Sequence, residues 1–125
     1  MPGSEPLLLV DKSAYAHGAA AAELDGELCL CAVTRLELLF SARSPDHYVA
    51  LEEDLGLFRD LRMDAATFAT AASAQRELAR AGRHRVPIPD LLIAACAQQH
   101  GADVVHVDRH FEALGSVLSF APVRL

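Results

Sequence analysis

Four acidic residues stand where apolar, strand-like runs give way to helix-like segments: Asp11, Glu37, Asp90 and Asp108. In an open α/β sheet such positions converge at one edge of the sheet. Carboxylates gathered there repel one another, and in proteins this repulsion is usually offset by a hard divalent cation that the carboxylate oxygens bind. The sequence therefore predicts a Mg²⁺ or Mn²⁺ site, of the kind that most often serves phosphoryl transfer.

Each acid, taken singly, also has a purely structural explanation. Asp11 suits a turn after a strand, Asp90 and Asp108 suit helix N-caps, and Thr34 with Glu37 fits a capping box. However, Asp11 directly follows the apolar run 7–10, and Asp108 follows the run 104–107 in the same way. Because capping alone does not require that repetition, the joint pattern favours shared chemistry.

The elements that must position these acids alternate between strands and helices. Ser13 is expected to cap the first helix and Asp64 the long alanine-rich one. The prolines at 87 and 89 are expected to hold an extended segment, and Gly101 to close the helix that begins at Asp90. Strands are expected at 7–10, 28–33, 61–63, 104–107 and 121–125, and helices at 13–24, 34–42, 44–58, 64–81, 90–97 and 108–114. This alternation predicts an α/β fold, one domain over residues 1–125, with a central parallel twisted sheet flanked by helices on both faces.

Composition narrows the class of protein. The hydrophobic content of 52% is high for 125 residues, which predicts that part of the surface is covered by a partner. No apolar run approaches the roughly 20 residues that cross a bilayer, so we expect a cytoplasmic protein.

The three cysteines, Cys29, Cys31 and Cys96, lack C-x-x-C spacing and are interpreted as buried, reduced thiols. A structural zinc site would need closer Cys or His partners.

A net charge of −6 argues at first against a nucleic-acid partner, because phosphate binding usually depends on Lys and Arg. The segment 76–85, however, holds four arginines against one acid. Arg83 and Arg85 in this strip are candidates for substrate contact. A solvated helix end, where cations suit the helix dipole, accounts for the strip equally well.

Four motifs in order resemble a known family. They are Leu-Val-Asp11-Lys-Ser13, Thr34-x-x-Glu37-Leu-Leu, Pro89-Asp90-x-Leu-Ile-Ala-Ala and His106-Val-Asp108-Arg-His-Phe111. Together they resemble the PIN domain, in particular the VapC toxins of bacterial VapBC toxin–antitoxin pairs, over essentially the whole chain. The chain departs from the family at His110, where many relatives carry an Asp.

The resemblance implies a Mg²⁺- or Mn²⁺-dependent endoribonuclease that forms a homodimer and is inhibited by a cognate VapB antitoxin. Asp11, Asp90 and Asp108 would hold the cation. Glu37 would support these ligands from outside or position the attacking water. Ser13 would bond a carboxylate or the phosphate. Lys12 and Arg109 flank the acids and are candidates for contacting the RNA backbone, with tRNA or ribosomal RNA as the expected substrates.

Two other functions compete with this interpretation. A receiver-like signalling domain also gathers acids around Mg²⁺, but it would need a lysine near the last strand, and Lys12 is the chain's single lysine. A PIN fold that has lost catalysis would act as a binding module. Retention of all four acids argues against that second alternative, whereas His110 leaves it open.

Overall fold

The computed structural model describes residues 5–19 and 23–125. These residues form strands and helices in alternation, as the sequence predicted. The strands are β1 (Leu7–Val10), β2 (Glu27–Leu30), β3 (Arg59–Asp60), β4 (Asp103–His106) and β5 (Pro122–Arg124). The helices are α1 (Lys12–Ala16), α2 (Ala32–Phe40), α3 (Pro45–Leu55), α4 (Ala65–Arg80), α5 (Ile88–His100) and α6 (His110–Leu114).

The strands form one parallel sheet in the order β3-β2-β1-β4-β5. From β1 the chain builds the sheet outward through β2 and β3, and then returns to add β4 and β5 on the other side of β1. The order therefore reverses between β1 and β4, and ligands of open α/β sheets bind beyond the carboxyl ends of the strands at such a point. The predicted parallel sheet is confirmed.

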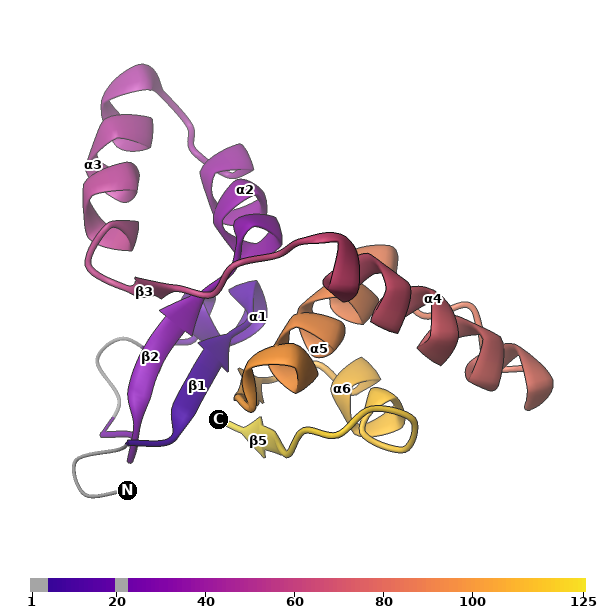
Figure 1. Cartoon of the computed structure of the whole chain (residues 1–125). Helices are drawn as coiled ribbons and strands as arrows, with labels where there is room; N and C mark the ends of the chain where they lie inside the picture. The colour runs from indigo at the N-terminus through magenta and orange to yellow at the C-terminus, as the bar shows by residue number, and fades with distance from the viewer. Residues whose placement is uncertain (1–4, 20–22) are drawn as a thin grey trace.

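Alternating side chains along the strands create two apolar layers, one on each face of the sheet. Leu9 and Val104 pack with α4, α5 and α6, whereas Leu8 and Val105 pack with α1, α2 and α3. Figure 1 shows α4, α5 and α6 gathered on one side of the sheet, away from α3. Helices thus cover both faces, and the apolar strands are buried as expected of a parallel sheet.

Several predicted boundaries were wrong. The first helix ends at Ala16 rather than at residue 24, and part of the remaining expected range, residues 20–22, lies outside the described residues. The second strand stops at Leu30, because residues 32 and 33 already belong to α2. The strand expected at 61–63 is β3 at 59–60, although the Leu61 amide still donates to the Leu30 carbonyl at 2.8 Å.

Other local predictions are confirmed, with one exception at Pro89. Asp64 caps α4 and forms a capping box with Thr67. Gly101 ends α5 in the left-handed conformation, with φ of 65°, which glycine adopts without steric cost. Pro89 lies in the first turn of α5 rather than in an extended segment, because the missing proline N–H costs nothing there. No helix within the described residues is long and apolar enough to span a membrane.

Candidate metal centre

Asp11 lies directly beyond the last residue of β1 and is 1% exposed. Its Oδ2 accepts hydrogen bonds from the Ser13 amide at 3.1 Å and the Ser13 hydroxyl at 2.6 Å. Asp11, not Ser13, is therefore the N-cap of α1, which corrects the sequence prediction. The Ser13 hydroxyl oxygen in turn accepts from the Val107 amide at 3.1 Å, which ties α1 to the segment that follows β4.

Asp90 reaches the same edge from the first turn of α5. This helix is apolar on nearly all sides, so it packs into the core, and the carboxylate at its start is only 6% exposed. The N-cap is Pro87, so Asp90 is not the cap that the structural explanation required.

Asp108 follows β4 by two residues, and its Oδ1 accepts a hydrogen bond from the His110 amide at 2.9 Å. The imidazole of His110 folds back over this turn. Its Nδ1 lies 2.7 Å from Asp108 Oδ1 and 3.1 Å from Asp90 Oδ2. One oxygen from each of these acids and the His110 nitrogen lie within 4.8 Å of one another.

Glu37 projects from α2 and pairs with Lys12, whose Nζ lies 3.2 Å from Glu37 Oε2. The capping box expected between Thr34 and Glu37 is absent, because α2 begins at Ala32 with Cys31 as its N-cap. The fully buried Thr34 hydroxyl instead lies 3.7 Å from the Cys31 sulfur. Glu37 is therefore free of the structural role that competed with a functional one.

The charges of the four acids act on one another. The pKa of Asp90 is raised to about 6, first by burial and then by the negative charges of Asp11 and Asp108, with Glu37 adding to the effect and His110 opposing it. Four side chains from four separate segments thus share one electrostatic environment. The convergence predicted from the sequence is present in the fold.

Three buried carboxylate oxygens of this cluster lack a hydrogen-bond partner: Asp11 Oδ1, Glu37 Oε1 and Asp90 Oδ2. A buried, unpaired carboxylate oxygen is costly unless something positive binds it. Oxygen donors of this kind suit Mg²⁺ and Mn²⁺. The residues present therefore fit a divalent cation bound at Asp90 and Asp108, where the unpaired oxygens of Asp11 and Glu37 add negative charge.

The predicted basic contacts lie around this centre rather than in it. Lys12 forms an ion pair with Glu37, and Arg109 is exposed at the start of α6. Arg83 and Arg85 are exposed in the loop that joins α4 to α5. Figure 1 shows the end of α4, where this loop begins, lying away from the sheet. Among the described residues, neither of these two arginines forms an ion pair with the four acids.

Sequence reasoning singled out His110 as a departure from the family pattern but predicted no histidine as a ligand or a base, yet two histidines shape the site. His106 is fully buried in β4, and its Nδ1 accepts from the Asp108 amide at 3.1 Å. Its Nε2 lies 2.8 Å from Glu112 Oε2, and its ring packs on Phe111 with centroids 5.3 Å apart. His106 therefore supports the turn that carries Asp108, while His110 joins the acids directly. The departure of His110 from the family pattern was the signal that pointed to it.

The three cysteines are buried and unpaired with one another, as expected. No zinc-type cluster of cysteines occurs among the residues the structure describes.

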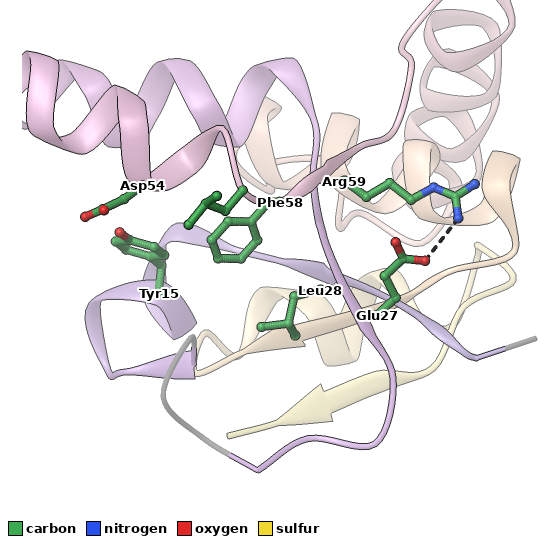
Figure 2. Close-up of a pocket in the computed structure, with 7 residues that line it drawn as sticks. Tyr15, Glu27, Leu28, Asp54, Phe58 and Arg59 are labelled. Carbon is green, nitrogen blue, oxygen red and sulfur yellow. Dashed lines mark hydrogen bonds and ion pairs between the residues drawn. The ribbon is translucent and has the colours of Figure 1, made fainter.

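A separate cavity of about 470 Å³ contains none of the four acids. Figure 2 shows Tyr15, Leu28 and Phe58 along it, Asp54 facing Tyr15, and Glu27 paired with Arg59 at 3.1 Å. Glu27 begins β2, so this end of the cavity lies at the amino end of that strand, whereas the acids follow the carboxyl ends of the strands. The cavity is therefore separate from the candidate metal centre.

Comparison with known proteins agrees with the fold. The PIN domain family model matches residues 8–117. Ribonuclease VapC17 of Mycobacterium tuberculosis is 35% identical over 116 residues, covering 87% of each chain. Ribonuclease VapC18 of the same organism is 38% identical over 120 residues, covering 86% of this chain and 87% of the relative.

Among solved structures, VapBC-5 of M. tuberculosis, described as a member of the VapBC family of toxin–antitoxin systems, superposes with a TM-score of 0.76. It is 27% identical and covers 96% of this chain and 99% of its own. A receiver-like domain is thereby excluded. The extent of these matches, together with the acid cluster at the carboxyl edge of the sheet, shows that the chain belongs to the PIN-domain family and, within it, to the VapC-type ribonucleases.

Proposed function

We propose that the protein is a Mg²⁺- or Mn²⁺-dependent endoribonuclease that serves in the cytoplasm as the toxin of a type II toxin–antitoxin pair. The observation that carries this proposal is the cluster of Asp11, Glu37, Asp90 and Asp108, with three buried carboxylate oxygens that accept no hydrogen bond. A site of this kind is arranged to receive positive charge.

Within the cluster, Asp11, Asp90 and Asp108 hold the cation, and Ser13 fixes the Asp11 carboxylate in place through two hydrogen bonds. A bound divalent ion supplies a water of lowered pKa and neutralises the charge that builds on the phosphate oxygens. Glu37 keeps one oxygen on Lys12 and leaves the other unpaired, so that it can accept a hydrogen bond from the attacking water. In-line attack would leave a 5′-phosphate and a 3′-hydroxyl, without use of the ribose 2′-hydroxyl.

The substrate is RNA, as the names of the relatives indicate, and structured RNAs of translation such as tRNA or ribosomal RNA are the proposed targets. Because the protein is acidic overall, phosphate binding must depend on local cations. Arg109 stands exposed beside the acids. Arg83 and Arg85 lie on the loop leading into α5 and are candidates for contacting more distant phosphates of the strand.

The antitoxin partner is a VapB-type protein, since solved relatives are VapBC complexes. A groove of about 360 Å³ is lined by Lys12, Leu36, Glu37 and Phe40. Phe40 is 92% exposed and Leu36 65%, so two exposed apolar side chains border the ion pair between Lys12 and Glu37, whose second carboxylate oxygen is unpaired. This groove fits an antitoxin segment that carries an aromatic anchor and an arginine, whose guanidinium would take the place of the cation.

We further propose a homodimer. The high hydrophobic content and exposed apolar side chains such as Phe68 and Ile88 support association of two copies. Sedimentation velocity of the purified protein at micromolar concentration would give twice the monomer mass if this is right, and a single monomeric species if it is wrong.

The nuclease is tested by incubating total cellular RNA with purified protein in Mg²⁺, Mn²⁺ or EDTA, with fragment ends mapped by sequencing. Discrete metal-dependent cuts bearing 5′-phosphates are expected. The absence of cleavage by well-folded protein under every metal would favour the alternative, a PIN-fold binding module without catalysis.

A further inference from the structure

The feature that distinguishes this site from an all-oxygen cation site is the imidazole of His110, which lies among its carboxylates. His110 is the first residue of α6, and its side chain is 34% exposed. Its Nδ1 atom, however, is buried and points into the acid cluster rather than toward solvent. A side chain that was merely tolerated at the surface would not need to bury its nitrogen between two carboxylates.

The contacts of this nitrogen are close but are not hydrogen bonds. Nδ1 lies 2.7 Å from Asp108 Oδ1 and 3.1 Å from Asp90 Oδ2. Nonetheless, neither His110 Nδ1 nor Asp90 Oδ2 has a hydrogen-bond partner of acceptable geometry. The His110 nitrogen and the two carboxylate oxygens therefore lie close together without forming hydrogen bonds to one another.

Such separations match those between neighbouring ligands of one cation. Ligands about 2.1 Å from an octahedral ion and at right angles to each other lie about 3 Å apart. The two measured distances fall on either side of that value. The Asp90 carboxylate supports the same conclusion independently. It is only 6% exposed, and its Oδ2 atom, which lies beside His110 Nδ1, accepts no hydrogen bond.

The surroundings hold His110 in this position. The Asp108 carboxylate accepts from the His110 backbone amide, which fixes the start of α6. The next residue, Phe111, is fully buried and packs on the ring of His106. Because the backbone is anchored on both sides of the imidazole, little ordering is needed when a ligand binds.

We propose that His110 Nδ1 is a direct metal ligand beside Asp90 and Asp108, so that the centre selects a divalent transition ion such as Mn²⁺ over Mg²⁺. This inference deepens the proposed function, since it rests on the same metal site. Its reason is ligand chemistry: oxygen donors alone suit Mg²⁺, whereas an imidazole nitrogen adds affinity for transition ions and adds little for Mg²⁺.

The test measures metal binding without RNA. Titration calorimetry gives the Kd of Mn²⁺ and of Mg²⁺ for the intact protein, for His110→Ala and His110→Asp, and for His84→Ala, which changes an exposed histidine in the loop before α5. Pulsed electron paramagnetic resonance of the Mn²⁺ complex reports whether a nitrogen nucleus is coupled to the ion. Circular dichroism verifies that each variant is folded.

We expect nitrogen coupling in the intact protein and in His84→Ala, and its loss in both His110 variants. The preference for Mn²⁺, expressed as the ratio of the two Kd values, should fall about tenfold or more in His110→Ala, as for loss of an important metal contact. His110→Asp should bind Mg²⁺ more tightly than the unmodified protein does, because it adds an oxygen donor to the site.

Two results would overturn the inference, and they are distinguishable from failure of the proposed function. Mn²⁺ binding without nitrogen coupling and with an unchanged preference would reduce His110 to an ion-pair partner of the acids, leaving the nuclease proposal intact. Failure of the folded protein to bind either metal would overturn both proposals. Nitrogen coupling without any RNA cleavage would support the role of His110 and refute the nuclease.

Discussion

Replacing Asp90 with asparagine should stabilise the metal-free protein while destroying its metal site. Asp90 is buried among other negative charges, and its pKa is raised from 3.8 to about 6 by burial and by Asp11 and Asp108. A raised carboxyl pKa means that the folded state binds this proton more tightly than the unfolded state does. The charged form therefore destabilises the fold above about pH 6, and asparagine removes that charge.

The magnitude follows from the shift. A difference of about 2 pKa units corresponds to about 3 kcal/mol of unfavourable free energy for the ionised form at pH 8. The asparagine amide can also donate hydrogen bonds to neighbouring carboxylates. Allowing for relaxation around the site, we expect a gain of about 2 kcal/mol, which for a chain of this size is a rise in Tm of about 8 °C.

Thermal and urea unfolding in EDTA at a series of pH values measure this effect. The stability difference between Asp90→Asn and the unmodified protein should vanish near pH 4, grow between pH 4 and 6, and stay constant above that range. Saturating Mn²⁺ should reverse the order, because the metal binds and stabilises only the protein that retains the carboxylate.

Asp46→Asn is the matched control, since Asp46 lies exposed in the first turn of α3. It should lose up to about 1 kcal/mol through the helix dipole. If Asp90→Asn were as stable as the unmodified protein or less so at pH 8 without metal, mutual repulsion in the cluster would be refuted as a source of instability.

Three further predictions concern the supports of the site, the groove and the fold. Ser13→Ala should keep the fold but weaken Mn²⁺ binding about tenfold in calorimetry, because it frees the Asp11 carboxylate; an unchanged Kd would show that Ser13 is only a link to the Val107 amide. Phe40→Ser should weaken antitoxin binding in a pull-down from co-expressing cells without lowering Tm, since this ring is exposed; an unaffected complex would place the partner elsewhere. Gly101→Ala should cost about 1–2 kcal/mol in urea unfolding, because φ is 65° there although the space is open; a neutral effect would contradict the strain argument.

The sequence predicted the parts of this fold that depend on local patterns. The apolar runs predicted β1 and β4, Asp64 predicted the start of α4, and Gly101 predicted the end of α5. Because parallel strands align their carboxyl ends, the positions of Asp11 and Asp108 were enough to predict that they meet.

What the sequence did not predict depends on tertiary contacts. The division between a strand and the following helix at Cys31 could not be read from an apolar run that suits either state. Ser13 looked like a helix cap, yet Asp11 caps α1 and receives the hydroxyl as well. The approach of His110 to Asp90 joins residues from two elements and is visible only in the assembled fold.

The most direct test of the account compares the intact protein with Asp11→Asn in two assays run side by side: Mn²⁺ binding by calorimetry and cleavage of total RNA. Asp11 is 1% exposed, has an unpaired carboxylate oxygen and acts on the charge of Asp90, so both activities should disappear together while circular dichroism stays unchanged. Cleavage that persisted in a folded Asp11→Asn protein, or that was unaffected by EDTA, would contradict the claim that these carboxylates hold the catalytic metal.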